Sequence, residues 1–142
     1  MEDIYNLQRF VDAQGHDYES IARELESGQK QGHWMWYIFP QIIGLGRSEV
    51  AQRFAISSKQ EAKAYLQHPI LGPRLRQCTK LVNSIEDRSI EQIFSYPDNM
   101  KFHSSMTLFI FSCDENELFI EALDKYFDGS YDDLTIDILS SI

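Results

Sequence analysis

Three side chains with complementary chemistry lie at helical spacing in the third quarter of the sequence. Asp98, Lys101 and Ser105 are spaced i, i+3 and i+7, so a helix would place them on one face, with Ser104 next to it. A serine beside a lysine can act as nucleophile and base when burial lowers the lysine pKa, and a nearby carboxylate can move protons. We therefore take Asp98, Lys101 and Ser105 as candidate catalytic residues and Ser104 as a candidate ligand contact. The simpler alternative is a helix cap at Asp98 and a weak surface ion pair with Lys101.

An unusually aromatic segment follows Lys30. Both tryptophans of the chain, Trp34 and Trp36, lie in it together with His33 and Gln41. One interpretation is an aromatic wall for a flat ligand, with His33 as an acid–base group. The ligand contacts would then be Lys30, Trp34, Trp36 and Gln41. The alternative is a hydrophobic plug, because burial contributes about 25 cal/mol per Å² of apolar surface and a buried indole N–H needs a polar partner.

A third polar group surrounds two prolines. His68 precedes Pro69 and Arg74 follows Pro73, a pattern typical of a helix start. A cation in the first turns of a helix is poorly placed against the helix dipole unless an anion lies nearby. We therefore take His68 and Arg74 as candidate ligand contacts. The alternatives are a capping role for His68 and a salt bridge from Arg74 to an acidic helix.

We expect these three segments to meet in space although they are distant in sequence. Buried polar groups need partners, so His33, Arg74 and Asp98 or Lys101 should lie near one another. Cations that could meet an anion there are Lys30, Arg74 and Lys101. The sequence contains no Gly-x-Ser-x-Gly, P-loop or Gly-x-Gly-x-x-Gly pattern and no His-x-x-x-His spacing. We therefore expect neither a metal nor a cofactor, and the sequence does not decide whether the protein is an enzyme.

Helical signals recur along the whole chain and predict an all-α fold. Apolar residues repeat at helical spacing, and Ser58 and Ser89 begin capping-box patterns. Residues 107–111 would also suit a strand, but they continue a helical pattern. We predict a single compact multi-helix domain over residues 1–142, without a sheet of three or more strands. The expected helices begin at or just after Asp3, Asp17, Ser48, Ser58, Pro69, Ser89, Asp98, Glu115 and Asp132.

Composition and charge limit the classes of partner. The 142 residues carry a formal net charge of −9, which argues against general binding to nucleic acid. Residues 29–110 carry six acids and ten bases between two acidic ends. This contrast indicates either an anion-tolerant cleft in the middle of the chain or acidic ends that only confer solubility. Without a membrane-spanning apolar run, a basic leader or a cysteine framework, we expect a cytoplasmic protein that binds neither nucleic acid nor a membrane.

The same unusual segments resemble the domain of unknown function 1810 family. The resemblance rests on HWMWYIFPQ at residues 33–41, Gly-Leu-Gly at residues 44–46 with Ser48, His-Pro at residues 68–69 with Arg74, and residues 98–109. It covers the chain from residue 7 to residue 135. The resemblance implies a compact, helical, monomeric domain of bacterial cytoplasmic origin, and it implies no activity because the family is uncharacterised.

Two details qualify the resemblance. Gly32 stands where a small hydroxyl residue is expected, and Gln29 stands where a basic residue is expected before Lys30, so an anion site is less well supported there. Members of the family are sometimes labelled calpastatin, but nothing in this sequence supports protease inhibition.

Two classes of function follow from these patterns. In the first, the protein binds or processes a small anionic aromatic ligand, such as a nucleotide or an ADP-ribose-like compound. In the second, the three segments pack as a structural core, and the protein is a structural protein or acts through its surface on another macromolecule. A concave pocket walled by these side chains would favour the first class, and a sealed core would favour the second.

Overall fold

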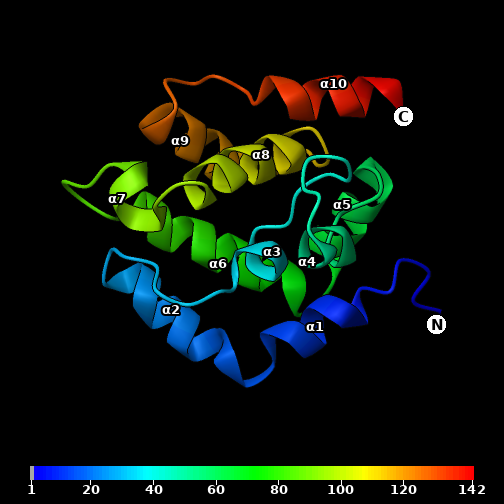
Figure 1. Cartoon of the computed structure of the whole chain (residues 1–142), viewed down its shortest axis with the longest axis horizontal. Coiled ribbons are helices and arrows are strands. Elements are labelled where there is room, and N and C mark those ends of the chain that lie inside the picture. The colour runs from blue at the N-terminus through cyan, green and yellow to red at the C-terminus, as the bar shows by residue number, and fades with distance from the viewer. Residues whose placement is uncertain (1) are drawn as a thin grey trace.

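The computed structural model describes residues 2–142, and its regular elements are helices joined by loops (Figure 1). Within these residues the backbone forms a single parallel bridge, between Ile42 and Ile56, and no strand, so the predicted all-α fold is confirmed. The helices are α1 (Gln8–Gln14), η1 (Gly15–Asp17, a 3₁₀ turn), α2 (Tyr18–Glu26), α3 (Met35–Ile38), α4 (Glu49–Arg53), α5 (Lys59–Gln67), α6 (Leu71–Asn83), α7 (Ile90–Phe94), α8 (Asp98–Ile110), α9 (Glu117–Tyr126) and α10 (Asp133–Ser141).

Two 13-residue helices, α6 and α8, form the centre of the domain. In Figure 1, α1 and α2 lie on one side of α6, and α9 and α10 lie beyond α8 on the other side. Helix α6 packs against α2, α5 and α9, whereas α8 packs against α5, α7, α9 and α10. None of the helices described is both long enough and apolar enough to cross a bilayer.

The sequences of the two central helices explain their positions. Leu71, Leu75, Cys78 and Val82 form one apolar stripe on α6, and all four are buried. Helix α8 is buried nearly all round over its last seven residues, because neighbours cover it on several sides. A helix buried on every face needs apolar or internally bonded side chains at every position. This explains why residues 107–111 look strand-like in sequence although residues up to Ile110 are helical.

The aromatic segment contributes to the core through edge-to-face ring contacts. The Phe39 ring lies 5.0 Å from that of Phe102 in α8 and 5.9 Å from that of Phe94 in α7, both nearly perpendicular. The Trp34 ring lies 6.4 Å from that of Phe94. Such pairs stabilise beyond the area that they bury, by about 0.5–1.5 kcal/mol each. The segment around α3 is therefore held against α7 and α8.

Serine caps fix several helix starts as predicted. The Ser48, Ser58 and Ser89 side chains each accept a hydrogen bond from the backbone N–H three residues later. The capping box at Ser89 is complete, because Gln92 bonds back to the Ser89 N–H. At Ser58 the capping box lacks its reciprocal bond, because the Glu61 carboxylate accepts hydrogen bonds from Arg9 and Ser57 instead of from the Ser58 N–H.

Two predicted helix starts differ from the structure, and the start at Asp98 is confirmed. Helix α6 begins at Leu71 rather than at Pro69, because His68 Nδ1 first accepts the N–H groups of Ile70 and Leu71. Helix α8 begins at Asp98 as predicted, although Asp98 is its first residue, after Pro97, and not its cap. Asp3 binds the backbone N–H groups at the start of α1 from a turn upstream, and α1 itself begins at Gln8.

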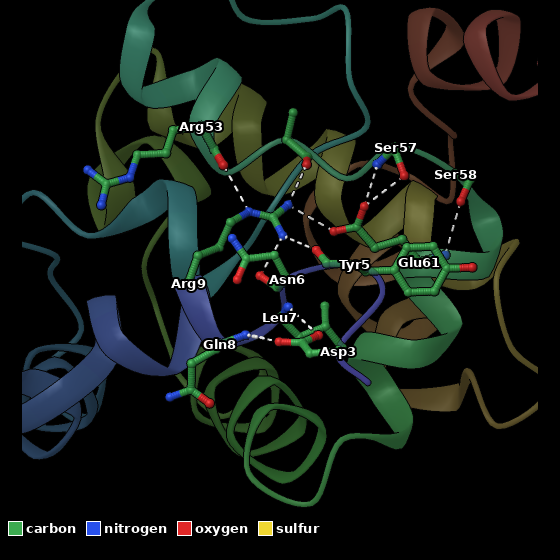
Figure 2. A network of polar contacts seen from close by, with 11 residues as sticks. Asp3, Tyr5, Asn6, Leu7, Gln8, Arg9, Arg53, Ser57, Ser58 and Glu61 are labelled. Carbon is green, nitrogen blue, oxygen red and sulfur yellow. Dashed lines mark hydrogen bonds and ion pairs between the residues drawn. The ribbon is translucent and has the colours of Figure 1, made fainter. Parts of the chain in front are cut away.

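The Arg9 side chain joins the N-terminal segment to the loop between α4 and α5 (Figure 2). Its guanidinium donates to the carbonyl oxygens of Tyr5 (2.6 Å), Asn6 (2.9 Å), Arg53 (2.9 Å) and Ala55 (2.8 Å). It also lies 2.9 Å from Glu61 Oε2, an ion pair in which Glu61 is only 4% exposed. The second Glu61 oxygen accepts from the N–H and hydroxyl of Ser57. The planar guanidinium group of Arg9 thus hydrogen-bonds backbone carbonyls from two segments of the chain.

Replacing Arg9 should therefore destabilise the whole domain. Arg9→Ala leaves the buried Glu61 carboxylate without its cation, and we expect it to lower the free energy of unfolding by about 3 kcal/mol or more. Arg23→Ala, at an exposed position on α2, should change it by about 0.5 kcal/mol or less. Urea unfolding monitored by circular dichroism measures both. Equal stability of the two variants would contradict a structural role for the Arg9 contacts.

Candidate functional site

The structure brings three predicted site residues together around one carboxylate. Lys30 Nζ lies 2.8 Å from Asp98 Oδ2, and Lys101 Nζ lies 3.3 Å from Asp98 Oδ1. Lys101 is one turn after Asp98 on α8, whereas Lys30 comes from the segment after α2. The Lys30 backbone N–H is held by the carbonyl of Ile93 at 2.8 Å, and its ammonium also donates to the carbonyl of Gly32. One negative charge therefore faces two positive charges.

Each of these lysines also lies over a tryptophan ring. Lys30 Nζ is 5.2 Å from the Trp34 ring centre, and Lys101 Nζ is 4.5 Å from the Trp36 ring centre, distances typical of cation–π contacts. The two indoles differ in exposure, since Trp34 is only 3% exposed and Trp36 is half-buried. Trp34 thus belongs to the core, and Trp36 keeps part of its surface in contact with solvent.

Glu24 is the polar partner of the aromatic segment. Its Oε1 accepts hydrogen bonds from the backbone N–H groups of Gln31 (2.6 Å) and Gly32 (2.9 Å) and from the indole Nε1 of Trp34 (2.9 Å). Burial raises the pKa of Glu24, but these three hydrogen bonds, with the Lys30 charge, outweigh it and hold the pKa below its ordinary value of 4.5. Sequence reasoning missed Glu24, and the only signal for it was that a buried indole N–H requires an acceptor.

The remaining polar residues of the aromatic segment lie toward solvent. His33 is exposed. Gln41 is partly buried, and it lines a depression beside Trp36 with a volume of about 20 Å³. A space of that size holds about one water molecule. It is too small to be the walled pocket that would favour a ligand of nucleotide size.

Arg74 and His68 have partners of their own. The Arg74 guanidinium donates to Gln14 Oε1 at 3.2 Å and lies 4.5 Å from the Tyr18 ring centre. Its contacts are a carboxamide and a phenol ring, where the sequence suggested a carboxylate or a ligand anion. His68 Nδ1 accepts two N–H groups at the start of α6, which is the capping role considered as an alternative. Within residues 2–142, neither side chain forms a hydrogen bond or an ion pair with Asp98, Lys30 or Lys101.

The two serines of α8 face the protein interior. Ser104 Oγ donates to Asp132 Oδ2 at 2.9 Å, and Asp132 in turn caps α10. Ser105 is completely buried, and among residues 2–142 no partner lies within hydrogen-bonding distance of its Oγ. Ser105 is therefore on the same helix as Asp98 and Lys101, but its hydroxyl is enclosed in the protein interior. Helical spacing places the three residues along one stripe, but neighbouring helices cover the Ser105 end of that stripe.

Within residues 2–142, the structure adds neither a metal-binding group nor a reactive thiol to this site. No three His, Cys, Asp or Glu side chains within residues 2–142 are grouped so as to hold a metal ion. Cys78 and Cys113 are free thiols. Burial raises the pKa of Cys78 to about 12 and also raises the pKa of Cys113, so both are poor nucleophiles at neutral pH.

The Glu24 contacts predict a pH-dependent stability. Because the folded pKa is lowered, the Glu24 carboxylate stabilises the fold fully above its ordinary pKa of 4.5, and this contribution is lost as the pH falls through the folded value. Glu24→Gln should lower the free energy of unfolding by about 1–2 kcal/mol at pH 7. The difference in free energy of unfolding between wild type and variant should become smaller below pH 4.5. Urea titrations from pH 7 to pH 3, with Glu26→Gln on the same helix as a control, test this; a difference that stays constant would contradict it.

Comparison with known proteins places the chain in a family. The solved structures include the conserved hypothetical protein Rv1873 from Mycobacterium tuberculosis, a crystal structure that is 52% identical and superposes with a TM-score of 0.96. The match covers 97% of this chain and 99% of that one. The comparison with curated proteins gave no match. A family model described as a protein of unknown function (DUF1810) matches residues 4–139, so the chain belongs to the DUF1810 family.

Proposed function

We propose that the protein binds a small anionic ligand with an aromatic ring, such as a nucleotide derivative, on the open surface of the Trp36–Lys101 edge, since the depression beside Trp36 is too small to enclose it. This edge consists of Trp36, Lys101 and Asp98. The observation that supports it is the sharing of one carboxylate by two ammonium groups, directly beside the half-buried indole of Trp36. The protein has a net charge of −9, so a site of local positive charge stands out. An ammonium group that shares its carboxylate keeps part of its positive charge and can attract an anion to the adjacent aromatic surface.

Lys101 would contact the anion. Its side chain is 23% exposed, and Asp98 lies nearer to Lys30 than to Lys101, at 2.8 Å against 3.3 Å. A charge-assisted contact from Lys101 to a phosphate or carboxylate would contribute about 1.5–3 kcal/mol. Because this edge borders solvent, binding should weaken as the ionic strength rises.

Trp36 would contact the ring of the ligand. Aromatic rings prefer to pack in offset or edge-to-face geometry. The ring of the ligand would therefore pack against the part of the Trp36 indole that Lys101 does not cover. The neighbouring polar side chains available to such a ligand are those of His33 and Gln41. Arg74, His68 and Ser104 are engaged by protein partners elsewhere, and we do not include them in the site.

The Trp36–Lys101 edge would be held in place by Lys30, Trp34 and Glu24. Trp34 is buried, its indole N–H bonds Glu24, and Lys30 bonds both Asp98 and the carbonyl of Gly32. These completed contacts favour the structural interpretation for this half of the aromatic segment. Lys30 keeps Asp98 in place, and this leaves Lys101 as the cation that can turn to a ligand.

Lys101→Ala should weaken ligand binding more than folding. Losing the ion pair and the cation–π contact should lower the free energy of unfolding by about 1 kcal/mol, since partly exposed pairs contribute little. Losing the contact to an anion should reduce affinity about ten- to a hundredfold. A thermal-shift panel of AMP, ADP-ribose, NAD and inorganic phosphate measures both effects, because a ligand raises the apparent melting temperature.

Lys80→Ala is the matched control, since Lys80 is an exposed helical lysine on α6. It should keep the full ligand-induced shift. If Lys101→Ala keeps the same shift as Lys80→Ala, the anion binds elsewhere. If no compound of the panel stabilises the wild-type protein and Lys101→Ala melts far lower, Lys101 is a structural residue.

A further inference from the structure

A second surface feature lies at the other end of α8, around Phe111. Phe111 is 40% exposed and lies at the junction of two depressions. The larger, of about 600 Å³, is bordered by α5, α6 and the residues after α8. The smaller, of about 160 Å³, lies between the start of α5 and α10. Because Phe111 lines both, they adjoin, and we call them together the Phe111 groove.

The Phe111 groove has a basic wall. Lys59 and Lys63 line the two depressions from α5 at i and i+4, so they share one helical face, and Arg76 lines the larger one from α6. Lys59 and Lys63 are exposed, and none of the three cations forms an ion pair within residues 2–142. This contrasts with Lys30 and Lys101, which share Asp98. The groove thus presents two exposed lysines without an ion-pair partner. The Arg76 guanidinium donates to the Glu115 carbonyl at 2.8 Å and lies over the Phe119 ring, and Asp114 and Glu115 line the same depression.

Two exposed aromatic side chains and several less exposed aliphatic ones border the same groove. The Phe111 and Tyr131 rings are in edge-to-face contact at 4.9 Å, and Tyr131 is 44% exposed. Leu66 lines the larger depression, and Ile136 and Leu139 line the smaller one. Aromatic side chains at the centre of a polar surround are the usual anchors of protein–protein interfaces.

We propose that the Phe111 groove docks an acidic segment of a partner protein that carries a large apolar side chain. The apolar side chain would seat against Phe111 and Tyr131, and the acidic groups would face Lys59, Lys63 and Arg76. Charge complementarity selects this occupant. A flat anionic membrane fits less well, because the surface is concave. This docking is independent of the ligand proposed at Trp36.

Selection from a random 12-residue peptide library displayed on phage, with the full chain as bait, tests the docking proposal. Counter-selection uses the Phe111→Ser variant. Enriched peptides should contain Asp or Glu beside an aromatic residue or leucine. A synthetic enriched peptide should bind at least tenfold more weakly to Phe111→Ser and to Lys59→Glu/Lys63→Glu. Lys80→Glu should bind it as wild type does.

The charge variant keeps the test valid if Phe111→Ser folds poorly, because Lys59 and Lys63 are exposed. Enriched peptides that are basic, or that bind all variants equally, would overturn the proposal. So would an absence of enrichment over the counter-selected variant. Binding to phosphatidylserine vesicles that is lost in the same variants would assign the groove to a membrane, and a dimer lost in Phe111→Ser would assign it to a second copy of the chain.

Discussion

The Asp98 carboxylate is the contact on which the arrangement of the aromatic segment depends. It joins Lys30, which follows α2, to Lys101 on α8, and so ties two distant parts of the chain together. Without it, two ammonium groups over two neighbouring indoles would repel each other. Asp98 is also the first residue of α8, where the helix dipole favours a negative charge. The same carboxylate therefore stabilises α8 and positions the segment that precedes α3.

The short helix α3 gives the two tryptophans different environments. Trp34 lies just before α3 and Trp36 lies within it. Residues two apart on a helical turn point to different sides, so the same chain segment can send one indole into the core and leave the other at the surface. Glu24 completes the buried side by accepting the Trp34 N–H. The buried half then supports the exposed half, which is where a ligand could make new contacts without disrupting the core.

Local signals predicted the parts of this structure that depend on neighbours in sequence. The caps at Ser48, Ser58 and Ser89 and the pairing of Asp98 with Lys101 follow from spacings of three residues. Long-range partners were not predictable in this way. The Gln14–Arg74 bond spans 60 residues, and the Arg9 guanidinium binds backbone carbonyls, which every residue possesses. The burial of Ser105 was not predictable either, because helical spacing gives a face but does not say which neighbouring helix covers it.

The most direct measurement is a titration of the two indole N–H signals by proton–nitrogen NMR, with AMP as the probe. The chain has only two tryptophans, so Trp36→Phe assigns both signals. If the Trp36–Lys101 edge is the binding site and Trp34 its buried support, the Trp36 signal should shift to saturation. The Trp34 signal, bonded to Glu24, should remain in place. A saturable shift of Trp34 with an unchanged Trp36, or no shift of either at millimolar AMP, would contradict this division of the aromatic segment.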